Sequence, residues 1–166
     1  PAVTADLRGY VNDIRDMVVL RPGGTFNGKD ANIYDNAGRV LLRGGELAVS
    51  WVPGDNLLVS GDIAYVRGTD EDTGDDLPFM PPVNGHLSAR WNLIPSLWLE
   101  PVLTMTGGQT ASAPGEDETA GYALLDITGG WQIAHNAAID GDVIIGVRNI
   151  TDRRYEHHLT ESRTFP

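Results

Sequence analysis

The feature that most constrains this chain is a regular alternation of apolar and polar residues. From Leu57 to Tyr65, apolar or small side chains occupy every second position, and the residues between them include Ser60 and Asp62. A period of two places all the apolar side chains on one face of a β-strand. The same pattern recurs in residues 47–51, 125–133 and 143–147. Apolar residues at helical spacing never extend beyond two turns, so the sequence predicts an all-β fold.

The alternating segments define seven strands joined by connections of two lengths. The predicted strands span residues 5–21, 37–52, 56–67, 84–93, 97–106, 120–134 and 139–150. Long connections at 21–36, 68–82, 107–119 and 151–166 alternate with short turns at 53–55, 94–96 and 135–138. In an antiparallel up-and-down meander, all the long connections then lie at one end of the sheet. This asymmetry is typical of transmembrane β-barrels.

Composition excludes several classes of protein. The 166 residues include no Cys, so a disulfide scaffold and thiol catalysis are excluded. Twenty-three acidic against 12 basic residues give a net charge of −11, which argues against a nucleic-acid partner. No apolar run is long enough for a transmembrane helix. Motifs for a nucleophile elbow, a phosphate loop and a zinc protease are all missing, so we expect no enzyme and no cofactor.

Acidic residues concentrate in two of the long connections, which makes them candidates for ligand binding. The candidates are Asp70, Asp72, Asp75 and Asp76 in one connection, which also holds Glu71, and Glu116, Asp117 and Glu118 in another. Asp70, Asp72, Gly74 and Asp76 have the spacing of a calcium loop, but Pro81 stands where the twelfth position requires Glu. An EF-hand is therefore excluded. Solvated loop tips and attraction of cations at one rim of the sheet both remain open.

Two adjacent histidines, His157 and His158, lie in the last long connection, directly after Glu156. Imidazole and carboxylate groups suit Zn, Ni, Cu or Fe, so this pair is the candidate metal site. Two exposed loop histidines are the alternative, because adjacent residues of an extended segment point to opposite sides.

Aromatic residues gather near the strand ends. Trp51, Trp91 and Trp98 lie beside the short turns, whereas Tyr34, Tyr65, Tyr122 and Tyr155 lie toward the long connections. Two such bands are expected of the aromatic girdles at the two membrane interfaces.

Four segments, in order along the chain, resemble the barrel of TonB-dependent outer-membrane receptors. Tyr10–Val18 resembles their strand with an aromatic residue followed by "nDirD", and Asn36–Leu47 resembles their "N-x-G … G-x-E-l" strand. Gly74–Pro82 resembles their "G-x-x-L-P-x-x-P-P" loop. Gly146–Tyr155 is similar to the "G-V-x-N-L-x-D-x-x-Y" segment before the final strand, with Ile150 in place of the usual Leu. His157-His158-Leu159 is like the "x-H-L" that sometimes follows.

The resemblance implies a receptor that imports a scarce nutrient across the Gram-negative outer membrane. Ligands of the family include ferric siderophores, haem, cobalamin, metal ions and some glycans. Its barrel has about 22 strands, is filled by a plug domain, and receives energy from the TonB complex through that plug. The implied partners are outer-membrane lipid, the TonB complex, and a small molecule or metal chelate.

On this resemblance, residues 1–166 correspond to the C-terminal part of a barrel, without the plug domain and without the final strand. Unpaired edges of such a segment invite self-association. Two other readings stay open at this point: a free-standing small outer-membrane barrel with a structural or adhesion role, and a soluble acidic β-barrel or sandwich that binds a ligand.

Overall fold

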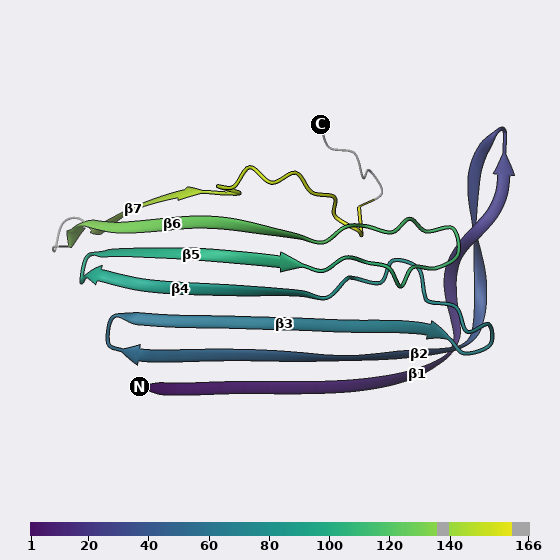
Figure 1. Cartoon of the computed structure of the whole chain (residues 1–166), viewed down its shortest axis with the longest axis horizontal. Helices are drawn as coiled ribbons and strands as arrows, with labels where there is room; N and C mark the ends of the chain where they lie inside the picture. The colour runs from purple at the N-terminus through teal and green to yellow at the C-terminus, as the bar shows by residue number, and fades with distance from the viewer. Residues whose placement is uncertain (136–139, 161–166) are drawn as a thin grey trace.

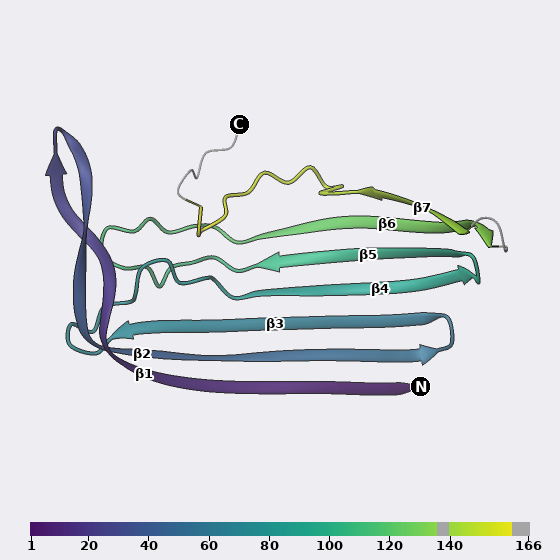
Figure 2. The ribbon, with the colours of Figure 1, turned by 180° about the vertical axis from the view of Figure 1, so that it is seen from behind.

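The chain folds into one antiparallel sheet of seven strands that follow one another in chain order (Figure 1). The structure is a computed structural model that describes residues 1–135 and 140–160. The strands are β1 (Ala2–Phe26), β2 (Lys29–Gly54), β3 (Leu57–Asp70), β4 (Asn84–Ile94), β5 (Leu97–Thr106), β6 (Tyr122–His135) and β7 (Asp140–Val147). The predicted all-β meander is confirmed. The view from behind shows no second layer over the described residues (Figure 2), so a two-sheet sandwich is wrong.

The middle of the sheet follows the predicted strands closely. β5 has the predicted bounds, and β4 is longer by one residue. Short turns at 55–56 and 95–96 join β2 to β3 and β4 to β5. Residues 136–139 lie outside the described part of the chain, so the third predicted turn is not described in full.

The long connection predicted for residues 21–36 is wrong, because β1 and β2 continue through it as a hairpin. Leu20 pairs with Tyr34, and Phe26 pairs with Lys29. Asn27 and Gly28 form the two-residue turn with φ angles of 53° and 74°. A type I′ turn requires positive φ at both central residues, and Asn-Gly is the pair that best supplies it.

The β1–β2 hairpin turns away from the sheet at its far end. β3 accompanies β2 only as far as the pair Val40 and Asp70, so no third strand of the described residues pairs with the hairpin beyond that point. Asp16, which is left out of the pairing register between Arg15 and Met17, adopts a φ of 56°. Figure 1 shows the two arms rising steeply from the right-hand end of the sheet.

Pairing register gives the sheet two unlike faces, because residues directly opposite each other point to the same side. Leu7, Leu47 and Ile63 form one row, whereas the next row contains Asp6, Ala48, Asp62 and His86. We call the first side the apolar face. Its members include Val3, Leu7, Leu47, Val49, Trp51, Val59, Ile63, Leu87, Trp91, Leu99, Leu103, Leu125, Ile127, Trp131 and Ile145.

The opposite side, which we call the polar face, carries most of the charged and hydroxyl side chains of the strands. Its members include Thr4, Asp6, Arg8, Glu46, Ser50, Ser60, Asp62, His86, Ser88, Arg90, Glu100, Thr104, Asp126 and Thr128. A sheet whose two faces differ in this way separates an apolar medium from an aqueous one.

Tryptophans mark the end of the apolar face nearest the short turns. Trp51, Trp91 and Trp131 all lie on that face, each about half exposed. Trp98 was expected in the same band but lies on the polar face, where the guanidinium of Arg90 stacks on its ring at 3.9 Å. Its neighbour on β6 is Gly130, whose missing side chain leaves room for the indole ring.

Buried side chains cluster at the long-connection end. Val19 and Val40 from the hairpin pack with Leu77 from the connection after β3, and Val40 is 0% exposed. Gly68 lies beneath Leu77, and a Cβ there would come within 2.6 Å of a leucine methyl group. This small core holds residues 71–83 against β1, β2 and β3.

Candidate functional site

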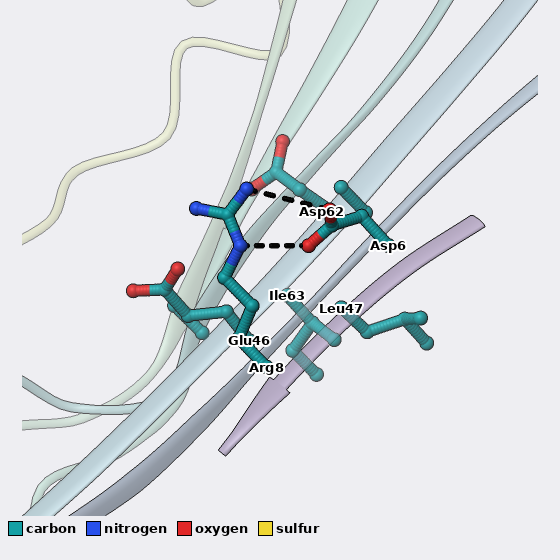
Figure 3. Close-up of a pocket in the computed structure, with 8 residues that line it drawn as sticks. Asp6, Arg8, Glu46, Leu47, Asp62 and Ile63 are labelled. Atoms are coloured by element: carbon teal, nitrogen blue, oxygen red, sulfur yellow. Dashed lines mark hydrogen bonds and ion pairs between the residues drawn. The ribbon is translucent and has the colours of Figure 1, made fainter. Parts of the chain in front are cut away.

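A shallow pocket on the polar face lies over the first three strands (Figure 3). Arg8 occupies its centre and forms an ion pair with Asp6, with 2.8 Å between Nε and Oδ1. Glu46 and Asp62 also line the pocket, so three carboxylates surround one guanidinium. The surroundings of Arg8 are therefore acidic.

Polar contacts continue along this face from strand to strand. The Asp62 carboxylate lies 3.1 Å from Nδ1 of His86 on the next strand. Ser50 and Ser60 face each other at 3.3 Å between their hydroxyl oxygens. At the short-turn end, Arg90 lies 3.6 Å from Glu100. Together these pairs make a hydrophilic surface that can line a water-filled lumen.

Asp70, the last residue of β3, stabilises the start of the connection between β3 and β4. It is 2% exposed, and its Oδ1 accepts hydrogen bonds from the backbone N–H groups of Asp72 (2.9 Å) and Thr73 (3.3 Å). Its carbonyl oxygen accepts a further bond from the N–H of Gly74 at 2.7 Å. Asp70 thus shapes the loop from within, and Asp72 is exposed at its surface.

Asp76 closes the same loop through a bidentate ion pair with Arg67. The guanidinium Nε and Nη2 atoms donate to its two carboxylate oxygens at 2.8 and 3.2 Å. Asp75, beside it, is partly exposed. Of the four aspartates predicted to contact a ligand from this connection, Asp72 and Asp75 therefore present the accessible carboxylates.

Glu116 joins two long connections to the segment after β7. Its Oε1 accepts from the N–H of Phe79 at 2.9 Å, and its Oε2 accepts from the N–H of Ala113 at 3.2 Å. The buried ring of His158 lies against it, with 3.3 Å between Nε2 and Oε1. On its other side, His158 shares a hydrogen bond of 3.1 Å with the hydroxyl of Thr119.

The structure separates the predicted histidine pair. His158 points inward between Glu116 and Thr119, whereas His157 is exposed, as are Asp117 and Glu118. Within residues 1–135 and 140–160, no group of three or more His, Asp or Glu side chains is placed to hold a metal ion. Metal binding at His157 and His158 stays a prediction.

Gln109 is a residue of this site that sequence reasoning missed. It is buried, pairs with Thr119, and donates from Nε2 to the carbonyl oxygens of Met80 (3.0 Å) and Ala111 (3.3 Å). Its contacts join connections far apart in the chain, and no local motif marks it. The row of polar-face charges, by contrast, could have been read from the alternation that revealed the strands.

The family model described as "TonB dependent receptor-like, beta-barrel" matches residues 1–150. The chain belongs to the TonB-dependent receptor family. The resemblance seen in four motifs is thereby confirmed. Members of this family are receptors rather than enzymes, in agreement with the missing catalytic motifs.

Solved structures of such receptors share the fold. The copper transporter OprC superposes with a TM-score of 0.84 at 20% identity, over 96% of this chain and 24% of that chain. A variant of the ferric enterobactin receptor PfeA from Pseudomonas aeruginosa gives a TM-score of 0.69 at 21% identity, over 94% and 24%. The siderophore receptor PirA from Acinetobacter baumannii gives 0.66 at 20% identity, over 91% and 26%.

The chain thus spans about a quarter of the length of these structures. No curated protein sequence matches it. Among the described residues, no helix is long and apolar enough to cross a membrane.

Proposed function

We propose that this chain is one arc of the barrel of an outer-membrane receptor that imports a metal chelate into Gram-negative bacteria with TonB-derived energy. The observation that carries the proposal is the opposite character of the two faces in a chain of this family. The apolar face would contact lipid, and the polar face would line the lumen.

The arc would belong to a much larger barrel. β1 and β7 are the outer strands of the described sheet, and each has backbone groups on one side that another strand could pair with. Barrels of this size contain about 22 strands, and the receptors compared above are about four times as long as this chain. Residues 1–166 would then form the C-terminal part of the barrel, with neighbouring strands on both sides.

Metal chelates are the favoured ligand class. OprC is named a copper transporter, PfeA a ferric enterobactin receptor and PirA a siderophore receptor. At the long-connection end, the chain offers exposed or partly exposed side chains that can contact a cationic metal complex or its chelating groups. These side chains are Asp72, Asp75, Asp117, Glu118 and His157.

Uptake by cells tests the proposal. The receptor would be deleted and then restored from a plasmid, and accumulation of radiolabelled ferric enterobactin and of copper(II) would be measured with and without the TonB complex. We expect the receptor to raise accumulation of one probe, in a TonB-dependent manner. A receptor absent from the outer-membrane fraction, or one that raises accumulation of neither probe, would contradict the proposal.

The exposed carboxylates have their own variant. Replacing Asp72, Asp75, Asp117 and Glu118 by the corresponding amides should weaken binding of the active probe. As a control, Asp55 and Asp142 at the short-turn end are replaced by Asn in the same way. This variant should leave binding unchanged.

A further inference from the structure

Two asparagines of this chain are followed directly by glycine, and the structure places them in opposite surroundings. Asn27-Gly28 forms the exposed turn at the tip of the β1–β2 hairpin (Figure 1). Asn84-Gly85 begins β4 in the middle of the sheet, with β3 on one side and β5 on the other. The same dipeptide can therefore be compared at a protruding tip and inside the sheet.

An asparagine before glycine can react with its own backbone. The nitrogen of the following residue attacks the side-chain Cγ, and glycine permits this approach because it has no Cβ. As the N–Cγ bond forms, the Cγ–Nδ2 bond breaks, and ammonia leaves with the proton of the attacking N–H group. Water then opens the cyclic imide at either carbonyl carbon, which gives aspartate or isoaspartate. The reaction needs only water and a backbone that can rotate the two groups together.

The backbone around Asn27 is weakly held. No third strand of the described residues pairs with this part of the hairpin. The register between its arms shifts between Pro22 and Thr25, so two pairs of residues beyond the shift close the turn. Segments with few packing contacts and exposed hydrogen bonds open locally at little cost in free energy. Asn27 should therefore leave its φ of 53° readily and reach the conformation that the attack requires.

The backbone around Asn84 is held on both sides. At this position β4 pairs with both β3 and β5. The Nδ2 of Asn84 donates a hydrogen bond to the carbonyl oxygen of Pro82 at 3.0 Å. Gly85 is buried, and a Cβ there would clash with the carbonyl oxygen of Asp62 on the neighbouring strand. Rotation at this site therefore requires two strand pairings to open together, which costs more free energy than opening a tip.

We propose that Asn27 is a site of spontaneous deamidation, and that the pairing of β4 on both sides protects Asn84 from the same reaction. Conversion of Asn27 adds one negative charge to a chain whose net charge is already −11. Isoaspartate also inserts a methylene group into the backbone, which a two-residue turn with two positive φ angles cannot accommodate unchanged. The hairpin tip therefore changes its charge and shape with time after synthesis, whichever nutrient the receptor imports.

Ageing of the purified full-length receptor tests this inference. The receptor in detergent would be kept for several weeks in mildly alkaline buffer, digested at mildly acidic pH, and analysed by mass spectrometry for conversion of amide to carboxylate. Fragmentation by electron transfer would distinguish isoaspartate from aspartate. We expect Asn27 to convert at least roughly tenfold faster than Asn84, a ratio that corresponds to a difference of about 1.4 kcal/mol in the free energies of opening.

Two controls separate the effect of the fold from the effect of the dipeptide. In denaturant, Asn27 and Asn84 should convert at similar rates, because both are followed by glycine. The variant Asn27→Gly keeps a pair that suits a type I′ turn and should abolish the conversion in the hairpin peptide. Equal rates at the two sites in the folded receptor would overturn the inference, as would an unconverted Asn27. A slow Asn84 in denaturant would also overturn it, because strand pairing would then not be the cause of the protection.

Discussion

Glu116 and His158 meet in the interior of the loop region, with 3.3 Å between the carboxylate Oε1 and the imidazole Nε2 and with both side chains almost fully buried. The same carboxylate holds the backbone of Phe79 and Ala113. One side chain thereby ties the segment after β7 to the connections after β3 and β5.

Replacing Glu116 by Ala should loosen these segments together. The change leaves two backbone N–H groups without their acceptor, at a cost of about 1–3 kcal/mol, and removes the carboxylate that lies against the buried imidazole. Hydrogen exchange in the intact receptor should accelerate at Phe79, Ala113 and the residues around His158. Glu118→Ala, at an exposed position close by, is the control. Identical exchange in the Glu116 and Glu118 variants would contradict the role of Glu116.

Gly130 should tolerate no side chain, because the indole of Trp98 occupies the space. An added Cβ would lie 2.4 Å from the ring atoms. Gly130→Ala should cost about 1–3 kcal/mol through overpacking. A shift of the unfolding midpoint of the purified receptor in denaturant would measure this cost.

The adjacent Gly129→Ala is the matched control for Gly130, since its nearest contacts begin at 3.4 Å. Combining Gly130→Ala with Trp98→Ala should remove most of the penalty for the Gly130 change. Additive effects of the two substitutions would show that the ring is not the cause.

Leu77 anchors the connection after β3, so Leu77→Ala should release it from the sheet. The side chain is 3% exposed in the small core with Val19 and Val40. Large-to-small changes in such cores cost about 2–5 kcal/mol. Limited proteolysis should cut within residues 71–83 faster in this variant than in Val18→Ala, whose side chain is 64% exposed. Equal cutting rates would argue against the anchoring role.

Asp13 should titrate at unusually low pH. Hydrogen bonding from Arg39 holds the pKa of this carboxyl below its ordinary value, and the group lies beyond the apolar band. A lowered pKa in the folded state means that the pair stabilises the fold above the ordinary aspartate pKa. That contribution disappears as the pH falls through the lowered pKa of the folded state.

Carboxyl NMR of the receptor in micelles can follow Asp13 directly. Arg39→Gln should raise its pKa toward the ordinary value, whereas Arg43→Gln, which removes a charge that does not bond Asp13, should leave it nearly unchanged. An unaltered pKa in the Arg39 variant would refute the assignment.

The alternation of apolar and polar side chains was sufficient to predict β3 to β6 within a few residues, because a sheet with one apolar face imposes a strict period of two. The outer part of the β1–β2 hairpin, residues 21–36, was not predicted because it leaves the sheet and carries polar residues. Asn27-Gly28 was its local signal, and reading that pair as a type I′ turn would have corrected the connection.

The loop contacts could not be predicted in the same way. Asp70 and Asp76 look like surface carboxylates in the sequence. In the structure, Asp70 accepts hydrogen bonds from the backbone of its own loop, and Asp76 pairs with Arg67. The inward position of His158 depends on Thr119 and Glu116, which lie in another connection. Such contacts follow from the assembled sheet: the predicted meander placed the long connections at one end, but it did not predict which of their residues would meet.

The β1–β2 hairpin has a practical consequence for studies in living cells. Its tip at Asn27-Gly28 stands clear of the other connections, and Phe26 beside it is 72% exposed. A short epitope inserted between Asn27 and Gly28 would be displayed away from the lumen and the lipid. Antibody labelling of intact cells would then report which end of the strands faces the surroundings.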